Sequence, residues 1–356
     1  MAVEEGLPLL YVLHSGNLYG TERMALATAE GLRPGFRPTI FAPAGPALEL
    51  AGRNGMATRA FAGPLELARQ LRPFLAQHRQ LALVATGIAQ SLVFIGLNAL
   101  YRRRCCHLHV VHGGASEKLS YGRKRLLQPF AVHYVAVSAF VKERLVANGV
   151  AAERIGVIEN FLPEAQVAAA PQRAPGWPDG IRRVLVVSRV DPLKRVDLLL
   201  EALDQEPALA GLRVKVLGTG WELEKLRQRA AESHPNVAFA GFSAEVAREM
   251  AQADLLLHLC PSEPFGLAIL EAMAAGLPVL VPDAGGAGSL VEQGVSGFRF
   301  RADDAADLAS RLMALSQTGS GELERVSAGA RRVLETRFSP SERVGDYRRL
   351  LQEALR

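Results

Sequence analysis

Two glutamates spaced eight positions apart are the first residues whose types could do chemistry. In SEPFGLAILEAMAAGLPVL, residues 262–280, Glu263 lies in a predicted loop and Glu271 among apolar residues of a predicted helix that ends at Gly276 and Pro278. A carboxylate among apolar neighbours costs free energy unless a partner compensates for it. Glu271 therefore either faces solvent or binds a ligand. Because helical side chains lean toward the helix N-terminus, its carboxylate could accept hydrogen bonds from two vicinal hydroxyls, such as those of a ribose.

Two cations follow a predicted strand earlier in the chain. In VLVVSRVDPLKRVDLLL, residues 184–200, the apolar strand precedes Arg189 and Lys194, and a helix follows. A fork-shaped guanidinium and a compact ammonium that converge where a parallel strand ends suit a diphosphate. Gly266, at the start of the helix that carries Glu271, lets a ligand approach free N–H groups that attract phosphate. The competing interpretation is two cations that simply face solvent.

Two further motifs lie in the first half of the chain. In HSGNLYGTER, residues 14–23, a loop with Gly16 and Gly20 opens onto a predicted helix. In VVHGG, residues 110–114, His112 comes directly after a predicted strand. By itself His112 is better explained as a packed or hydrogen-bonded core histidine than as a site residue.

Strands and helices alternate along the sequence and must position these motifs. Short apolar runs predict strands at residues 9–13, 39–42, 81–86, 109–111, 134–137, 183–187, 214–217, 237–239, 255–259 and 279–281. Helical patterns lie at residues 22–32, 88–103, 139–148, 195–204, 221–231, 305–317 and 340–355. This alternation predicts an α/β protein with parallel sheets and right-handed crossovers.

Chain length and a proline-rich interruption predict two domains. At 356 residues the chain exceeds the size at which a single core usually keeps growing. AQVAAAPQRAPGWPDG, residues 165–180, has no periodicity and is typical of a linker. We predict an N-terminal domain over 1–165, a linker over 166–180 and a C-terminal domain over 181–339, with the helix in 340–356 able to pack back on the first domain. Since open parallel sheets bind ligands beyond their carboxyl strand ends, we expect a ligand cleft between the domains.

Composition indicates a soluble globular protein, with 49% hydrophobic and 22% charged residues. Three cysteines do not make a disulfide framework, which favours reduced thiols in a cytosolic protein. The acidic N-terminus, MAVEEGLPLLYVLHSG, does not resemble an export signal. We therefore expect a cytoplasmic location. No motif for nucleic-acid binding is present, so a nucleic-acid partner is not expected.

Basic residues are concentrated in the first half of the chain. Residues 1–170 contain 18 Lys/Arg and 11 Asp/Glu, whereas residues 171–356 contain 23 and 25. The excess, in Arg102–Arg104, Lys118 and Arg123–Arg125, is either a solvated surface or an attraction for an acidic substrate or an anionic membrane. In the last case the protein would be peripheral on the inner face of the cytoplasmic membrane. The apolar stretch 81–101 has the length of a membrane span, but its polar residues favour a buried strand and an amphipathic helix.

The pair Arg189 and Lys194, followed by Glu263 and Glu271, resembles the retaining glycosyltransferases of family GT4. That family has the GT-B fold, two Rossmann-like domains with parallel sheets that face each other across a cleft. The resemblance covers nearly the whole chain. It implies that Arg189 and Lys194 hold the diphosphate of the sugar donor, that Glu271 binds the ribose and that Glu263 lies against the transferred sugar. Backbone groups that would contact sugar hydroxyls and phosphate belong to Phe265, Gly266 and Leu267.

The first half resembles the family less closely. The resemblance implies that the loop with Gly16 and Gly20 lies near the diphosphate and acceptor, and that His112 lies beside the reactive carbon of the sugar. Where the family usually has two adjacent glycines in this loop, Tyr19 precedes Gly20. Two further departures are IENFLP, which keeps only the asparagine of a usual Asn-Gly turn, and Gly288-Ser289, which replace a usual Pro-Glu. These departures leave the donor motif intact and concern the acceptor and sugar selectivity.

We expect protein groups, without a metal or another cofactor, to stabilise the charge that develops during the reaction. The sequence contains no Asp-x-Asp pair of the kind that holds a divalent ion on a nucleotide sugar. Arg189, Lys194 and the helix N-terminus at Gly266 could instead stabilise the departing nucleoside diphosphate. We therefore predict a retaining, metal-independent hexosyltransferase. Its donor would be a nucleotide diphosphate sugar, most simply UDP-linked, and its acceptor a hydroxyl of a lipid-linked or cell-envelope glycan.

The sequence lacks the motifs of two other enzyme classes. A dinucleotide oxidoreductase would need a third glycine after Gly218-Thr219-Gly220, and an esterase would need a Gly-x-Ser-x-Gly elbow, which the sequence lacks. Two alternatives stay open, a non-catalytic nucleotide-sugar binder and a nucleotide-sugar epimerase of the GT-B fold.

Overall fold

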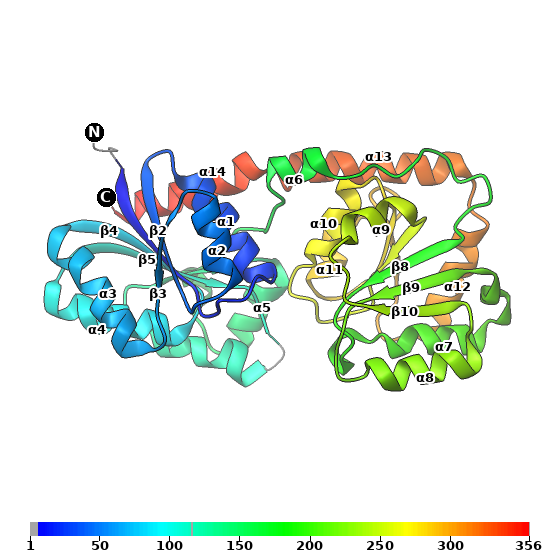
Figure 1. Ribbon diagram of the computed structural model, residues 1–356, viewed down its shortest axis with the longest axis horizontal. Helices are drawn as coiled ribbons and strands as arrows, with labels where there is room; N and C mark the ends of the chain where they lie inside the picture. Colours follow the sequence, from blue (N-terminus) through cyan, green and yellow to red (C-terminus); the bar gives the residue numbers. More distant parts are fainter. Residues whose placement is uncertain (1–5, 115–116, 356) are drawn as a thin grey trace. The chain divides into compact units, whose positions relative to one another are not determined.

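The protein consists of two α/β units, each built on a parallel sheet (Figure 1). The computed structural model describes residues 6–114 and 117–355, without the side chains of residues 117 and 118. One unit comprises Met1–Phe161 with Pro340–Arg356, and the other Leu162–Ser339. The prediction of two Rossmann-like units with parallel sheets is confirmed.

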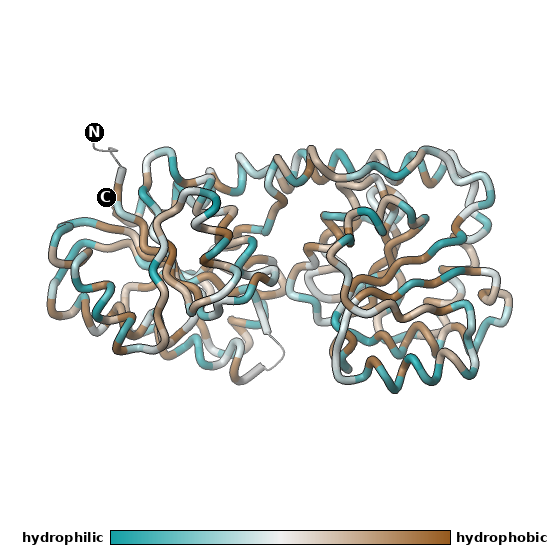
Figure 2. Tube along the Cα trace, in the orientation of Figure 1, coloured by the Kyte–Doolittle hydropathy of each residue, from teal (hydrophilic) through white to brown (hydrophobic). Residues whose placement is uncertain are grey.

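The first unit has a seven-stranded sheet in the order β3-β2-β1-β4-β5-β6-β7. Its strands are β1 (Leu7–Val12), β2 (Phe36–Ala42), β3 (Ala57–Ala60), β4 (Gln80–Ala85), β5 (Arg104–Val111), β6 (His133–Ala136) and β7 (Ile155–Val157). Strands β1 and β4 are buried along nearly their whole length, because helices cover both faces of a parallel sheet. Figure 2 shows these strands as the most hydrophobic part of the unit.

Helices pack on both faces of this sheet. They are α1 (Gly20–Leu32), α2 (Pro46–Arg53), α3 (Pro64–Gln77), α4 (Ile88–Tyr101), α5 (Ala139–Ala147) and α14 (Pro340–Glu353). Leu67, Leu71 and Leu75 recur at four-residue spacing, so α3 presents one apolar stripe to the core. The short helices η1 (Glu117–Tyr121) and η2 (Gly122–Leu127) follow β5.

The stretch 81–101 is a strand and a helix, as predicted, although the helix ends two residues early. Arg102 adopts a left-handed conformation, with φ of 51°, and ends α4. The Asn98 side chain then accepts a hydrogen bond from the Arg103 backbone N–H at 2.9 Å and donates one to the Arg103 carbonyl. None of the described helices is both long and apolar enough to cross a membrane.

The last helix, α14, packs on α1 within the first unit (Figure 1). Val344, Tyr347 and Leu351 form its buried face. A Cβ at Gly31 would lie 2.6 Å from Val344 Cγ2, so only glycine lets the two helices approach this closely. Arg348 donates a hydrogen bond to the Gly31 carbonyl across the same contact.

The second unit has a six-stranded sheet in the order β10-β9-β8-β11-β12-β13. Its strands are β8 (Arg183–Val187), β9 (Arg213–Leu217), β10 (Val237–Gly241), β11 (Leu255–Leu257), β12 (Val279–Pro282) and β13 (Phe298–Phe300). Its helices are α6 (Glu164–Ala169), α7 (Asp197–Gln205), α8 (Leu223–Ser233), α9 (Val246–Gln252), α10 (Leu267–Ala274), α11 (Gly285–Leu290), α12 (Ala305–Ser316) and α13 (Ser320–Thr336).

The segment predicted to be a linker, residues 166–180, belongs to the second unit. Its first residues continue α6, and the rest docks through Arg173 and Trp177. Arg173 stacks over the Trp177 ring at 3.7 Å and donates a hydrogen bond to Asp254 Oδ1 at 2.9 Å. The sequence prediction missed three short strands, β3, β7 and β13, because runs of three or four residues carry little periodicity.

Candidate functional site

The loops that carry the predicted donor-binding residues meet at one edge of the second sheet. All strands of this sheet are parallel, so the segments after β8, β9, β11 and β12 leave from its carboxyl edge. The strand order changes direction between β8 and β11. Such a switch point separates the loops that follow the two strands and creates a place for a ligand. Lys194 follows β8, and Glu263 follows β11.

A nearly buried ion pair joins these two loops. Lys194 Nζ lies 2.7 Å from Glu263 Oε2, and the two side chains are only 14% and 16% exposed. His258, directly after β11, approaches the same carboxylate oxygen, with Nε2 at 3.4 Å. The structure therefore brings together Lys194 and Glu263, which are 69 residues apart in sequence, and adds a histidine that the sequence analysis did not select.

The environment keeps both partners of this pair charged. Burial raises the pKa of Glu263, but the neighbouring His258 and Lys194 outweigh it and hold the pKa at about 2. Burial lowers the pKa of Lys194, and the attraction of Glu263 more than reverses that effect, so the pKa lies above its usual value. An ammonium and a carboxylate are thus present throughout the neutral pH range.

Arg189 lies in the same loop as Lys194 but is much more exposed. Its guanidinium Nη2 is 3.0 Å from Asp191 Oδ2, and its side chain is 65% exposed. The backbone around Arg189 is held by the loop after β9, where Val190 donates a hydrogen bond to the Thr219 carbonyl. A Cβ at Gly218 would lie 1.8 Å from the Ser188 carbonyl oxygen, so glycine is required for this contact.

The helix start at Gly266 has the backbone geometry that the sequence suggested. Gly266 has φ of 106°, in the left-handed region that favours glycine, and α10 begins at Leu267. Phe265 is buried and contacts the Phe338 ring edge-to-face at 5.9 Å between centroids. The loop from Pro261 to Pro264 rests on Gly286, whose backbone N–H donates to the Glu263 carbonyl at 2.6 Å.

Glu271 lies in the second turn of α10 and is half-buried. Its carboxylate has a partner within the protein. Gln166 Nε2 on α6 donates a hydrogen bond to Glu271 Oε1 at 3.1 Å. Glu271 thus lies on the helix that Gly266 begins, and Gln166 is one of its partners. Of the four charged residues, Lys194 and Glu263 are in direct contact, and Arg189 pairs with Asp191 while acting electrostatically on Lys194.

The first unit carries the remaining predicted residues. Gly16 lies in the loop after β1, where a Cβ would come within 2.3 Å of the Pro43 carbonyl oxygen. Gly20 begins α1, and Glu22 Oε2 accepts a hydrogen bond from the Tyr19 backbone N–H at 3.1 Å. The loop is thus fixed at both ends by close backbone packing and by the capping glutamate.

His112 follows β5 and is half-buried. Its Nε2 atom is buried without a hydrogen-bond partner among the described residues. Burial, together with the nearby His14 and Lys124, lowers the pKa of His112 to about 3, so the imidazole is neutral at neutral pH. An imidazole nitrogen without a partner is unusual in a packed interior and leaves His112 available for a ligand.

His258 and the glycines of the two supporting loops are the site residues that the sequence analysis missed. His258 was hidden because it extends an apolar strand, LLLHLC, and a lone histidine there is typical of the core. Gly218 and Gly220 were considered only as an incomplete dinucleotide fingerprint. Among the described residues, no group of three or more His, Cys, Asp or Glu side chains is arranged to hold a metal ion.

Two family models match the chain, one in each half. The model described as glycosyl transferases group 1 matches residues 170–333. The model described as Glycosyltransferase Family 4 matches residues 19–166. The first match contains all the predicted donor-binding residues of the second unit, and the second match contains Gly20 and His112.

Curated relatives of the chain are named as glycosyltransferases. The chain is 34% identical over 189 residues to a D-inositol 3-phosphate glycosyltransferase of Geodermatophilus obscurus, covering 49% of this chain and 41% of that protein. It is 26% identical over 335 residues to the amylovoran biosynthesis glycosyltransferase AmsK of Erwinia amylovora, covering 89% and 78%. The match to the first of these relatives spans less than half of its length.

Solved structures share the fold over the whole chain. The crystal structure of Anabaena HepE in complex with UDP-glucose superimposes with a TM-score of 0.80, at 22% identity, covering 98% of this chain and 100% of that one. At this level of identity the similarity demonstrates the fold.

Proposed function

The chain belongs to the GT4 family of glycosyltransferases, which have the GT-B fold, and from this premise we propose that it moves a hexose from a nucleotide diphosphate sugar to an acceptor hydroxyl. The observation that carries the proposal is the buried Lys194–Glu263 pair at the switch point of the second sheet. Taking two charges out of water costs free energy that their mutual attraction only partly recovers, and charged groups held in this way cluster at functional sites. Family membership supports retention of the anomeric configuration.

The second unit binds the donor in this proposal. Lys194 and Arg189 face the diphosphate, and the N-terminus of α10 at Gly266 adds its dipole. Backbone groups of Phe265, Gly266 and Leu267 contact phosphate and sugar hydroxyls. Glu271 then accepts hydrogen bonds from the ribose, in place of or beside the one from Gln166. We propose UDP as the nucleotide, a choice supported by the UDP-glucose that HepE binds on the same fold.

Transfer needs stabilisation of two developing charges. Negative charge grows on the leaving diphosphate as the glycosidic bond breaks, and Lys194 and Arg189 stabilise it without a metal ion in this proposal. Positive charge grows on the sugar, and the ionised Glu263 stabilises it electrostatically. His112 serves the transfer step as a neutral imidazole with an unused Nε2 atom.

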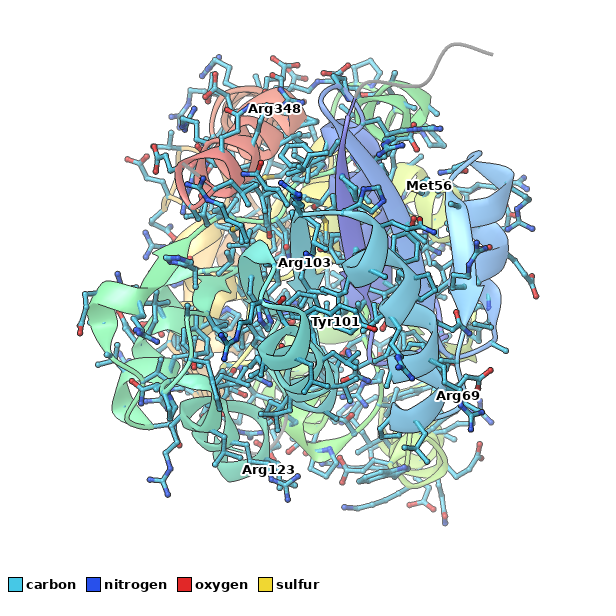
Figure 3. The ribbon with its side chains drawn as sticks, turned by 90° about the vertical axis from the view of Figure 1, so that its left-hand side faces the viewer. Met56, Arg69, Tyr101, Arg103, Arg123 and Arg348 are labelled. Atoms are coloured by element: carbon cyan, nitrogen blue, oxygen red, sulfur yellow. The ribbon has the colours of Figure 1, made fainter. Side chains whose placement is uncertain are left out.

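We place the acceptor on a lipid-linked or cell-envelope glycan and the first unit at an anionic membrane surface. Helix α4 has no charged residue, and its exposed face contains Leu92 and Leu100, the latter 79% exposed. Helix η2, which contacts α4, exposes Leu126 beside basic side chains. Figure 3 shows Arg69, Arg103 and Arg123 on the same side of the first unit. Of the predicted basic residues, Lys118 lies outside the described side chains.

Nucleotide-sugar binding and slow donor hydrolysis test the enzymatic proposal. We expect UDP-glucose or another UDP-sugar to raise the unfolding temperature, because a ligand at 100 times its Kd stabilises the native state by about 2.7 kcal/mol. Hydrolysis should continue in EDTA. Glu271→Ala should weaken binding about 10- to 100-fold, as expected for lost hydrogen bonds to a carboxylate. His112→Ala should slow hydrolysis more than it weakens binding.

Gln166→Ala is the matched control for Glu271→Ala, since it removes one hydrogen-bond donor to the carboxylate and leaves the carboxylate itself. Unchanged donor affinity in Glu271→Ala would remove that residue from the site. A protein that binds nucleotide sugars without ever cleaving or transferring them would be a binder, and a changed sugar without an acceptor would indicate an epimerase.

Co-sedimentation with vesicles tests the membrane proposal. The protein should bind phosphatidylglycerol vesicles at low salt and not phosphatidylcholine vesicles, and Arg102→Glu with Arg104→Glu should abolish most binding, since each basic residue near the surface contributes about 1 kcal/mol. Arg248→Glu with Arg332→Glu makes the same charge change on exposed positions of the second unit. Equal vesicle binding by the two double variants would contradict the assignment of the first unit.

A further inference from the structure

His258 shares one carboxylate oxygen with Lys194. Its side chain is 7% exposed, and Nε2 lies 3.4 Å from Glu263 Oε2, the oxygen that also accepts the 2.7 Å hydrogen bond from Lys194. Nε2 has no hydrogen-bond partner among the described residues. At 3.4 Å the contact is longer than a good hydrogen bond.

The position of this nitrogen decides where its proton lies. A lone pair on Nε2 would face a carboxylate oxygen and be repelled, so we assign the proton to Nε2. The other ring nitrogen, Nδ1, is then the atom that gains or loses a proton when His258 changes charge. A second proton would make His258 a cation directly beside Glu263.

Lys194 has one positive charge. In the proposed function two anions, Glu263 and the donor diphosphate, compete for it. Without a ligand its ammonium is in contact with Glu263. When a donor binds, the diphosphate attracts the same ammonium, and Glu263 keeps its charge in a nearly buried position with less compensation. A buried carboxylate that loses its partner is strongly destabilised, unless another cation forms beside it.

We propose that His258 is a positioning residue. It replaces Lys194 as the cation beside Glu263 when the donor diphosphate binds Lys194. In that step Nδ1 of His258 takes one proton from solvent, and the resulting imidazolium keeps Glu263 ionised and in place against the transferred sugar. No other bond forms or breaks. The inference rests on the proposed function, because it requires a diphosphate at Lys194.

Besides Glu263, Arg189 and Cys260 act electrostatically on Lys194. Arg189, on the loop after β8, is largely exposed and paired with Asp191, which reduces its field at the buried pair. Burial raises the pKa of the Cys260 thiol, so Cys260 is neutral, and its Sγ donates to the Leu193 carbonyl at 3.2 Å.

Isothermal titration with UDP-glucose in buffers of different ionisation enthalpy measures this proton directly. Both phosphates of UDP-glucose are esterified, so the ligand itself does not titrate near neutral pH. We expect proton uptake at pH 7.5 for the wild type. His258→Gln keeps an N–H donor near the position of Nε2 but cannot gain a charge. It should bind UDP-glucose at least about tenfold more weakly than the wild type and without proton uptake, and its hydrolysis rate should depend less on pH than that of the wild type.

His234→Gln is the matched control, because His234 is also buried in the second unit but pairs with Asp204 at 2.8 Å. It should keep the full uptake. A second measurement does not depend on any variant: ¹⁵N NMR of labelled histidine should show protonation of one imidazole Nδ1 on addition of UDP-glucose to the wild type.

Three results would overturn the inference. They are binding of UDP-glucose without proton uptake in the wild type, uptake that persists in His258→Gln, and an NMR spectrum without a newly protonated histidine. Each of these leaves the proposed function standing, since the donor still binds. Failure of UDP-glucose and all other nucleotide sugars to bind would overturn the proposed function, and this inference with it.

Discussion

Lys194→Met is expected to abolish detectable donor binding and to slow sugar transfer by a factor of about 10²–10³, the effect of removing one preorganised charge donor. The ammonium lies at the switch point of the second sheet, where the leaving diphosphate would develop its charge. The variant also leaves the buried Glu263 beside His258 alone, so the free energy of unfolding should fall by up to about 3–5 kcal/mol. Calorimetric titration with UDP-glucose and denaturant unfolding measure the two effects.

A second lysine–glutamate pair in the same unit provides the control for Lys194→Met. Lys215 Nζ lies 2.7 Å from Glu249 Oε1, but the lysine side chain is 44% exposed. Lys215→Met should cost about 0–1 kcal/mol of stability and leave donor binding unchanged. If Lys194→Met bound UDP-glucose as tightly as the wild type, the donor site would have to lie elsewhere.

Asp254→Ala is expected to destabilise the second unit by about 3–5 kcal/mol without changing donor affinity in the folded protein. The carboxylate is nearly buried and accepts hydrogen bonds from the Arg173 and Arg183 side chains at 2.9 and 2.8 Å. It also accepts from the backbone N–H groups of Arg182 and Arg183. Removal leaves the buried Arg173 guanidinium without its anion and frees the segment around Trp177. Asp254 precedes β11 and therefore lies at the edge of the sheet opposite the proposed donor site.

The same carboxylate makes part of the stability pH-dependent. Burial raises the pKa of Asp254, but the hydrogen bonds from Arg183 and Arg173 outweigh it, and the pKa lies below its usual value. A lowered folded-state pKa stabilises the protein fully above the unfolded pKa of about 4 and loses that effect as the pH falls further. Asp254→Ala should therefore show a smaller loss of stability than the wild type below about pH 4.

Glu322→Ala is the control for Asp254→Ala, because Glu322 and Arg325 form an exposed pair at 4.0 Å. It should change the free energy of unfolding by less than about 1 kcal/mol. A similarly small effect in Asp254→Ala would show that the buried network does not hold the segment from Arg173 to Trp177 in place.

Local sequence predicts some elements of this protein well and others poorly. The strand and loop around Arg189, and the loop and helix around Gly266, were predicted correctly because in each stretch the apolar run and the residues that mark the loop are close together in sequence. Helix α4 was also predicted, although its end depended on the Asn98 side chain and on the left-handed Arg102. Local sequence does not reveal such an ending, because most residues with this backbone conformation are glycines.

The sequence by itself determined the class of the fold, the two parallel sheets and the loops that carry Arg189, Lys194 and Glu263, since hydrophobic periodicity and residue type are local properties. Only the tertiary structure decided that Lys194 and Glu263 share one ion pair, that His258 approaches the same oxygen and that α14 packs on α1. These relations join residues or faces that the chain brings together by parallel pairing and packing. A parallel sheet places the ends of distant strands side by side, and no spacing within the sequence encodes which ends become neighbours.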